Sequence, residues 1–224
     1  MKPFLTLLLL LFFTSCTHNE FKLQKGDLLF QDLDCGKLCD AIEKVTTGIN
    51  GAKFSHVAIV SKIDTDGKAY VIEAYDGVEE TPVSEFLKRS HDDKGNPKVV
   101  AARLLPEYQY LVSVAVNRAH KLLGKKYDTK FAMNDDSYYC SELVYDIFKY
   151  DDKGKDIELF PLNIMTFKDP ETGKTMDVWK KYFKELGIPV PEGKPGINPG
   201  AISRSPKIRM VHAYGRPTLW QGAL

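Results

Sequence analysis

The sequence predicts an α+β fold, in which a small, mainly antiparallel sheet lies beside a separate group of helices. Strand-like segments joined by tight turns dominate the chain before residue 105, amphipathic helices dominate residues 107–186, and one more strand-like segment lies at 207–214. The 224 residues are 43% hydrophobic and 27% charged, which is typical of a globular chain with one substantial core. The formal net charge of +1 argues against a dedicated nucleic-acid binder.

The first part of the chain contains most of the expected strands. The turn sequence at 64–67, Asp-Thr-Asp-Gly, separates two β-branched apolar runs, which predicts a β-hairpin over 54–75. Residues 36–47 carry apolar side chains at helical spacing and stop before Gly48, which predicts a helix. The expected elements in this part are strands at 26–30, 54–63, 68–75 and 98–104, a helix at 36–47, and a short strand with a helical turn at 81–87.

The second part of the chain is mainly helical. A long amphipathic helix is expected at 107–123, and two further helices at 138–150 and 178–186. The stretch that follows is rich in proline and glycine, but a good strand comes after it at 207–214. We therefore interpret 187–206 as an ordered loop that returns to the sheet, with a disordered tail as the alternative.

The N-terminus indicates export. Residues 1–15 combine a positive start with a short apolar run, which is typical of a secretory signal and too short to span a bilayer comfortably; a retained anchor or a buried helix is the alternative. Phe13-Thr14-Ser15-Cys16 resembles the lipobox of bacterial lipoproteins, although Phe13 replaces the usual aliphatic residue. The resemblance implies acylation of Cys16, which anchors the protein durably to the cell envelope, on the outer side of the inner membrane or on the outer membrane. Residues 16–24 then form a tether, and 25–224 a single domain.

Cys140 is a candidate nucleophile. It falls in the first turn of the helix expected at 138–150, after a polar loop. The positive end of the helix dipole favours the thiolate and lowers the pKa of the thiol. The alternative is a buried structural cysteine, which is the commonest role of a lone cysteine.

His56 and Glu73 are candidate partners for this thiol. Each is a polar residue within an apolar strand of the expected hairpin, and a half-buried imidazole there costs free energy unless it is partnered. If the hairpin loop has an even number of residues, the two side chains share one face and lie within reach of each other; an odd loop separates them. A carboxylate at Glu73 would orient the imidazole and stabilise imidazolium. A satisfied core histidine is the alternative for His56.

These residues lie in segments that resemble the permuted NlpC/P60 cysteine hydrolases, the YiiX/YebB-like group of papain-like proteins. The order of the segments is reversed relative to the unpermuted family, in which the cysteine comes first, and the resemblance extends from about residue 25 to about residue 215. The matching segments are Gly26-Asp27-Leu28-Leu29-Phe30, Phe54-Ser55-His56-Val57-Ala58-Ile59-Val60, Gly124-Lys125-Lys126-Tyr127-Asp128 and Tyr139-Cys140-Ser141-Glu142-Leu143-Val144.

The resemblance implies a papain-like permuted fold, with the nucleophile at the N-terminus of a helix that packs on the sheet. It implies that Cys140 attacks a carbonyl and that His56 acts as base and then as acid. Glu73 is placed as the third residue, and Tyr127 matches a tyrosine that helps to form the oxyanion pocket, with a packing aromatic as the alternative. The backbone N–H of Cys140 is the other natural oxyanion donor. Asn198-Pro199-Gly200 and Ser203 resemble a late loop that lines the substrate pocket.

Three functions remain open at this point. The first is a thiol hydrolase that cleaves an amide bond in a cell-wall peptide or related small peptide through an acyl-enzyme. The second directs the same site at acyl lipids, as hydrolase or acyltransferase, because the fold resembles that of vertebrate lecithin:retinol acyltransferase. The third is a lipoprotein that binds peptides or amino acids without catalysis, against which the intact Cys140 and His56 argue.

Cys35 and Cys39 have no firm role in the sequence. They are four residues apart, and no further ligands lie nearby, so we expect no metal site and no cofactor. In an oxidising compartment the two can form a disulfide if Cys35 lies just before the helix, and the free and paired states are both open.

Overall fold

The computed structural model describes residues 21–133 and 136–222, so the expected signal segment 1–15 and Cys16 lie outside the described residues. The strands are β1 (Leu28–Gln31), β2 (His56–Ile63), β3 (Ala69–Ala74), β4 (Val78–Pro82), β5 (Val99–Leu104), β6 (Lys126–Tyr127), β7 (Ser137–Tyr138), β8 (Asn163–Ile164), β9 (Pro195–Gly196) and β10 (Ile208–Ala213). The α-helices are α1 (Lys37–Val45), α2 (Val83–Phe86), α3 (Val112–Lys121), α4 (Cys140–Phe148), α5 (Asp177–Glu185) and α6 (Pro199–Ser203). Single 3₁₀ turns lie at Ile49–Gly51 and Leu87–Arg89, and a longer one at Pro106–Leu111.

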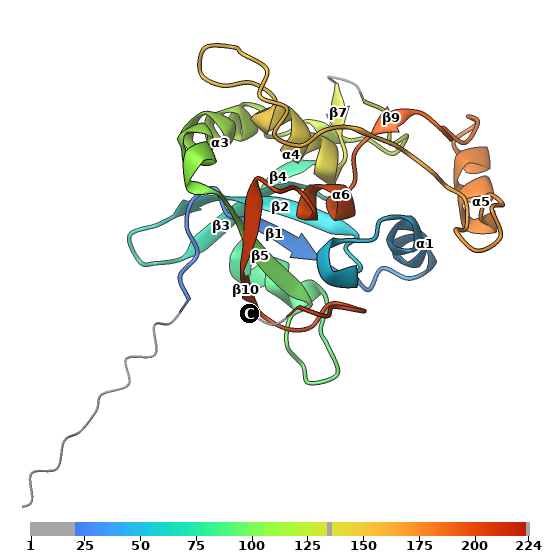
Figure 1. Ribbon diagram of the computed structural model, residues 1–224, viewed down its shortest axis with the longest axis horizontal. Helices are drawn as coiled ribbons and strands as arrows, with labels where there is room; N and C mark the ends of the chain where they lie inside the picture. The colour runs from blue at the N-terminus through green and yellow to red at the C-terminus, as the bar shows by residue number, and fades with distance from the viewer. Residues whose placement is uncertain (1–20, 134–135, 223–224) are drawn as a thin grey trace, which may run out of the picture.

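A six-stranded sheet forms the centre of the fold, in the order β10-β5-β1-β2-β3-β4 (Figure 1). Every neighbouring pair in it is antiparallel. Two small two-stranded ladders, β6 with β7 and β8 with β9, lie outside this sheet. The expected α+β class, with an antiparallel sheet packed against helices, is therefore confirmed.

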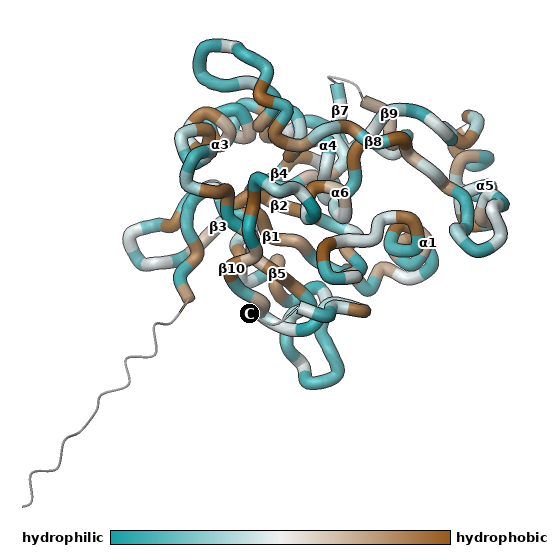
Figure 2. Tube along the Cα trace, viewed as in Figure 1, coloured by the Kyte–Doolittle hydropathy of each residue, from teal (hydrophilic) through white to brown (hydrophobic). Residues whose placement is uncertain are grey.

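Alternation along the strands sends apolar side chains to both faces of the sheet. On one face, Leu28, Val57 and Ile72 pack with residues of α3 and α4 in the largest core cluster. On the other face, Leu29 and Val71 pack with residues that include Val83 of α2. Figure 2 shows hydrophobic residues concentrated in the central strands, whereas the outlying loops are largely hydrophilic. The sheet is thus buried on both sides, which explains why its strands read as nearly continuous apolar runs.

A third apolar cluster joins α1 to α5 and is separate from the two sheet faces. Ala41 of α1 packs with Phe167, Trp179 and Phe183, and the ring centroids of Phe167 and Trp179 are 5.1 Å apart. These aromatic contacts hold the long excursion between α4 and α6 against α1. We call this group of residues the α1/α5 cluster.

The helix expected at 107–123 is shorter than predicted. Residues 106–111 form a 3₁₀ segment that begins with Pro106, and the regular helix α3 starts at Val112. The Gln109 side chain donates to the Leu104 carbonyl at 2.7 Å, which ties this tighter turn to the end of β5. The expected ordered loop at 187–206 holds β9 and α6, and it is anchored where the Ile197 N–H donates to the Tyr139 hydroxyl at 3.2 Å.

No helix among residues 21–133 and 136–222 has both the length and the apolar character needed to cross a membrane.

Candidate active site

Cys140 is the first residue of α4, where the helix meets the sheet. Glu142 accepts a hydrogen bond from the Tyr139 N–H at 3.3 Å, which fixes the start of the helix. Leu143, Val144 and Ile147 are fully buried and hold the helix in the main core. The Cys140 side chain is therefore presented at a rigid helix start, and its own N–H has no acceptor within the helix.

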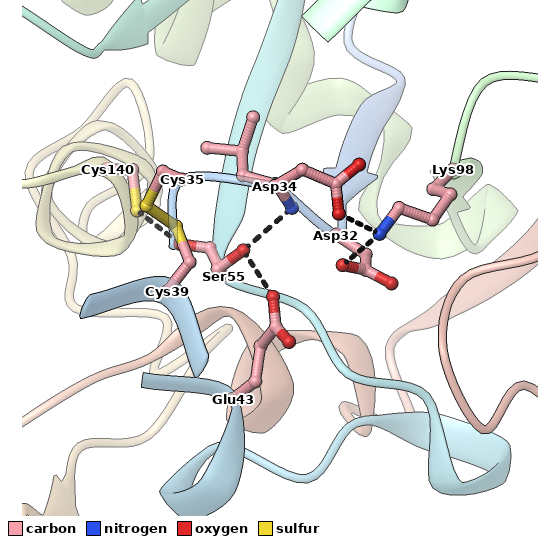
Figure 3. The surroundings of a disulfide bond; sticks show 9 residues. Asp32, Asp34, Cys35, Cys39, Glu43, Ser55, Lys98 and Cys140 are labelled. Atoms are coloured by element: carbon pink, nitrogen blue, oxygen red, sulfur yellow. Dashed lines mark hydrogen bonds and ion pairs between the residues drawn. A yellow bond between two sulfur atoms is a disulfide. The ribbon is translucent and has the colours of Figure 1, made fainter. Parts of the chain in front are cut away.

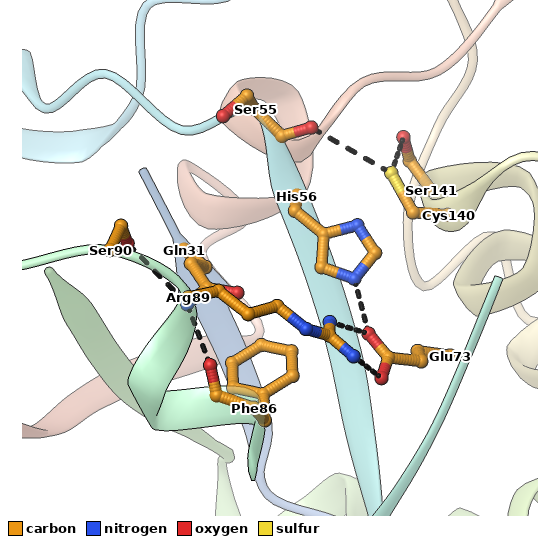
Figure 4. Close-up of polar contacts among 9 residues, drawn as sticks. All are labelled: Gln31, Ser55, His56, Glu73, Phe86, Arg89, Ser90, Cys140 and Ser141. Atoms are coloured by element: carbon orange, nitrogen blue, oxygen red, sulfur yellow. Dashed lines mark hydrogen bonds and ion pairs between the residues drawn. The ribbon is translucent and has the colours of Figure 1, made fainter. Parts of the chain in front are cut away.

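His56 lies between Cys140 and Glu73 (Figure 4). Its Nε2 is 2.6 Å from the Glu73 carboxylate, so the other ring nitrogen is left to face the Cys140 sulfur. Tyr75 and Phe86 flank the ring, with centroids 5.7 and 5.8 Å away. The expected contact between His56 and Glu73 is present, and the structure brings both residues to Cys140.

The contact between His56 and Glu73 depends on a β-bulge that the sequence analysis did not foresee. The loop between β2 and β3 comprises the five residues 64–68, an odd number that by itself would place the two side chains on opposite faces. However, the register shifts between Val60 and Lys62, so that Lys62 pairs with Tyr70 but Val60 pairs with Val71. The extra residue, Ser61, restores the shared face.

Arg89 is a site residue that the sequence analysis missed. Its guanidinium donates two hydrogen bonds to Glu73, one to each carboxylate oxygen, at 2.7 and 2.8 Å. The group also lies 4.0 Å from the Tyr75 ring centroid. Arg89 follows α2 in an ordinary polar run, so no local pattern distinguishes it, and only the folded chain brings it to Glu73.

The protonation states follow from these contacts. Burial alone would lower the pKa of His56, but hydrogen bonds to Cys140 and Glu73 outweigh it and raise that pKa to about 9. Burial alone would raise the pKa of the Cys140 thiol, but the contact with His56 outweighs it and lowers that pKa below its ordinary value. Burial opposes the charge on Glu73 as well, but His56 and Arg89 lower its pKa to about 2. These directions favour a thiolate–imidazolium pair beside a carboxylate.

Tyr127 lies in the wall of the pocket beside Cys140, as expected from the resemblance. β6 pairs with β7, so Tyr127 is opposite Tyr138, two residues before Cys140. Asp128 accepts hydrogen bonds from the N–H groups of Lys130 and Ala132 at 2.8 and 2.7 Å, which fixes the loop after Tyr127. Burial, and then the nearby Cys140, raise the pKa of Tyr127 well above its usual value, so its hydroxyl keeps its proton and can donate.

Ser55 connects Cys140 to α1 (Figure 3). Its carbonyl oxygen lies 4.0 Å from the Cys140 sulfur, and its hydroxyl accepts from the Leu33 N–H and donates to Glu43 of α1, both at 2.9 Å. Burial, together with the charge of Asp32, raises the pKa of Glu43 to about 8.

Cys35 and Cys39 form a disulfide in the structure, which resolves the alternative left open by the sequence. The bond ties the loop after β1 to the first turn of α1 (Figure 3). Cys140 is the one free cysteine among residues 21–133 and 136–222.

A pocket with about 440 Å³ of empty space, part of it open to solvent, lies beside Cys140. No Asp, Glu, Lys, Arg or His side chain is among the described residues that line it, and its walls come from α1, α5, the start of α4 and the segments around Phe131, Phe167 and Ile197. The lining residues are Ile42, Val45, Thr46, Ser55, Tyr127, Phe131, Tyr139, Cys140, Ser141, Met165, Thr166, Phe167, Trp179, Ile197, Asn198 and Pro199. The pocket thus suits an uncharged, apolar group.

The late loop contributes to this pocket only in part. Asn198 and Pro199 line it, and the Asn198 side chain caps α6 by accepting from the Ala201 N–H at 2.8 Å. Gly200 instead packs against α1, because a Cβ there would lie 2.2 Å from the Thr46 carbonyl oxygen. Ser203 is fully buried and bonds to the Gly200 carbonyl at 2.8 Å, so it holds α6 in place and is not part of the pocket lining.

Known proteins with a similar sequence and fold were found over most of the chain. The uncharacterized protein YiiX of Escherichia coli K12 is 27% identical over 207 residues, which cover 92% of this chain and 94% of YiiX. A crystal structure described as metalloprotein YiiX from Escherichia coli O157:H7 superposes with a TM-score of 0.67 at 23% identity, over 87% of this chain and 99% of that one. In the part of this chain that the structure describes, no three His, Cys, Asp or Glu side chains gather so that they could hold a metal ion.

The family assignment rests on the match to a sequence model of a known family. The model of the permuted papain-like amidase enzymes, the YaeF/YiiX or C92 family, matches residues 22–212. This range includes both segments that form the site described above, and the likeness to the YiiX crystal structure shows the same fold. The chain therefore belongs to the permuted papain-like amidase family of YaeF and YiiX, whose members are hydrolases of the amidase type.

Proposed function

We propose that this protein is a cysteine hydrolase that cleaves an amide bond through an acyl-enzyme on Cys140. The observation that carries the proposal is the placement of His56 between the Cys140 sulfur and the Glu73 carboxylate, at a helix start. A thiol, an imidazole and a carboxylate in this order are what nucleophilic catalysis by cysteine requires.

The reaction proceeds in two balanced steps. The Cys140 thiolate attacks the amide carbonyl carbon, and the oxyanion that forms accepts hydrogen bonds from the Cys140 N–H and the Tyr127 hydroxyl. The His56 imidazolium gives its proton to the leaving amine as the C–N bond breaks. Neutral His56 then takes a proton from water, the hydroxide attacks the thioester, and the carboxylic acid leaves as thiolate and imidazolium re-form.

The pocket narrows the substrate class. Because its described lining holds no charged side chain other than Cys140 itself, the group held beside Cys140 is uncharged and apolar. A small peptide, or a fragment of a cell-wall peptide, meets this requirement where an apolar residue flanks the scissile bond. Charged parts of such a substrate would lie outside the pocket.

An acyl lipid is the second candidate substrate, and the same pocket favours it. Phe131, Phe167 and Trp179 offer an aromatic wall to which a hydrocarbon chain can bind. The site would then act as a lipid acyl hydrolase or acyltransferase through the same thioester.

We also propose that the protein is a lipoprotein of the cell envelope, on the periplasmic side of the inner membrane or on the outer membrane. The proposal rests on the lipobox-like sequence that ends at Cys16. Growth of expressing cells with labelled palmitate should label the full chain but not a Cys16→Ala variant. Equal labelling of the two, or none, would contradict it.

Incubation of the full chain with muropeptides, dipeptides that carry apolar or charged first residues, and acyl lipids tests the activity. We expect turnover of a substrate with an apolar acyl group, an acyl adduct on the Cys140 peptide by mass spectrometry, and neither with Cys140→Ala. Turnover that survives Cys140→Ala would overturn the proposal. Binding of a panel member without turnover by the unaltered protein would instead support the non-catalytic binding role.

A further inference from the structure

The charges in the site alternate along a buried chain of four residues. In the thiolate–imidazolium form, Cys140 is negative, His56 positive, Glu73 negative and Arg89 positive, so the four charges cancel. Glu73 is fully buried, and the Arg89 side chain is only 18% exposed. Buried charges are stable only where they are compensated and hydrogen-bonded, and the fork of Arg89 on Glu73 meets both conditions.

Without Arg89 the same chain would carry one uncompensated negative charge. The cheapest way to remove that charge in a buried site is to bind a proton, and Cys140 is the group whose protonation restores neutrality while the His56–Glu73 pair stays intact. Glu79, the neighbour of Glu73 on β4, cannot substitute for Arg89, because it is itself acidic.

We propose that Arg89 is a positioning residue whose charge makes the buried chain Cys140–His56–Glu73–Arg89 neutral in its thiolate–imidazolium form and so keeps Cys140 ionised. Arg89 acts through Glu73 and does not touch the substrate pocket. Its orientation is set by the Phe86 and Tyr75 rings, which lie 5.3 and 4.0 Å from the guanidinium carbon. This inference deepens the proposed function, because it names what holds the nucleophile in its reactive state.

The test is the pH dependence of Cys140 alkylation by iodoacetamide in the full chain, followed for the Cys140-containing peptide by mass spectrometry. The measured quantity is the pH at which the alkylation rate reaches half its maximum on the acid side. We expect Arg89→Met to raise this midpoint by at least about one pH unit. The double variant Arg89→Met/Glu73→Gln removes both buried charges, restores neutrality, and should return the midpoint toward that of the unaltered protein. Arg89→Lys, which keeps the charge without the fork, should leave it nearly unchanged.

Arg103→Met is the matched control. Arg103 makes an equally buried two-pronged bond to Asp27, at 2.6 and 2.8 Å, and its side chain is 16% exposed. Loss of a buried Arg–carboxylate pair there costs stability but should leave the alkylation midpoint unchanged. An unshifted midpoint in Arg89→Met, a double variant that stays as high as Arg89→Met, or an Arg89→Lys variant that shifts as far as Arg89→Met would each overturn the inference.

The outcome separates this inference from the proposed function. A shifted midpoint in Arg89→Met without turnover of any amide would sustain the role of Arg89 and overturn the amidase. Amide turnover that depends on Cys140, with no shift of the alkylation midpoint in Arg89→Met, would support the amidase and overturn the role of Arg89.

Discussion

At the scale of single residues, His56 and Cys140 define the pH range in which the site can work. Hydrolysis needs the thiolate to attack and the imidazolium to protonate the amine. The thiolate is lost as pH falls through the lowered pKa of Cys140, and the imidazolium is lost as pH rises through about 9.

Amide turnover should therefore fall above about pH 9, whereas alkylation of Cys140 should not, because the thiolate persists there. Both rates, measured on the same protein across the pH range, check this. The free energy of unfolding depends on pH in the same direction. Because folding raises the pKa of His56, protonated His56 stabilises the folded state fully below about pH 6.5, and this stabilisation is lost as pH rises through about 9. Parallel alkaline limbs for turnover and alkylation would contradict the assignment of His56 as the acid.

The site residues differ in how far the sequence could reveal them. Cys140, His56 and Glu73 each interrupt a local pattern, a helix start or an apolar strand, so they are visible without a structure. Arg89 and Glu43 interrupt nothing, and their partners are 16 and 12 residues away in the chain. Their roles come from burial and pairing in three dimensions, which local patterns do not encode.

At the scale of elements, the hairpin of β2 and β3 shows why a correct residue assignment can rest on an incomplete argument. The sequence predicts the hairpin and its turn. The loop has an odd number of residues, which would separate His56 and Glu73, but the bulge at Ser61 returns both side chains to one face. Bulges have weak sequence signals, because they add a residue without changing the apolar pattern nearby. The small ladders of β6, β7, β8 and β9 are missed for a related reason, since two-residue strands carry no periodicity.

Deletion of Ser61 alone should leave the site intact, because Ser61 is the extra residue of the bulge. Without it the flanking residues of β2 keep their partners on β3, now in a regular ladder, and His56 stays on the face of Glu73. Deletion of both Ser61 and Lys62 removes one residue too many, turns His56 to the opposite face and should abolish the fast alkylation of Cys140. Circular dichroism and the alkylation rate measure this, and equal loss in the single and double deletions would contradict the role of the bulge.

The disulfide between Cys35 and Cys39 should stabilise α1 locally. It closes a short ring, for which chain entropy predicts roughly 2 kcal/mol of stabilisation. The double variant Cys35→Ser/Cys39→Ser should lower the free energy of unfolding by about this amount in urea titration and weaken binding in the pocket, because α1 carries Ile42 and Val45. The unaltered protein after mild reduction should be destabilised in the same way. If neither the double variant nor the reduced protein shows a lower unfolding midpoint, the disulfide does not stabilise the fold.

At the scale of the whole molecule, the pocket beside Cys140 lies between two differently built parts of the fold. One wall belongs to Tyr127, the start of α4 and residues 197–199, and the other belongs to the α1/α5 cluster. The sheet is recognisable in the sequence because its strands are long and apolar. The pocket is not, because its walls come from residues 42 to 199, which only the fold brings together.

The variant Phe183→Ala tests whether the α1/α5 cluster unfolds independently of the sheet. Phe183 is buried in the α1/α5 cluster but is not among the pocket residues, so its truncation should cost about 3–5 kcal/mol of packing there. Hydrogen exchange should rise in α1 and α5 but not in β1, β2 or β5, and the Michaelis constant should rise more than the turnover number falls. Tyr110→Ala, which truncates an exposed aromatic on the 3₁₀ segment, is the control. An equal rise of hydrogen exchange in the sheet and in the α1/α5 cluster would show instead that the two unfold as one cooperative unit.

Phe21, five residues after Cys16, stacks on His212 of β10, with ring centroids 4.3 Å apart. If Cys16 carries a lipid as proposed, five residues of chain can separate that lipid from the domain by at most about 18 Å, even when fully extended. The enzyme then cannot range through the periplasm in search of substrate. It works within roughly its own diameter of the membrane that holds it, and longer spacers inserted before Phe21 would extend its reach without altering its chemistry.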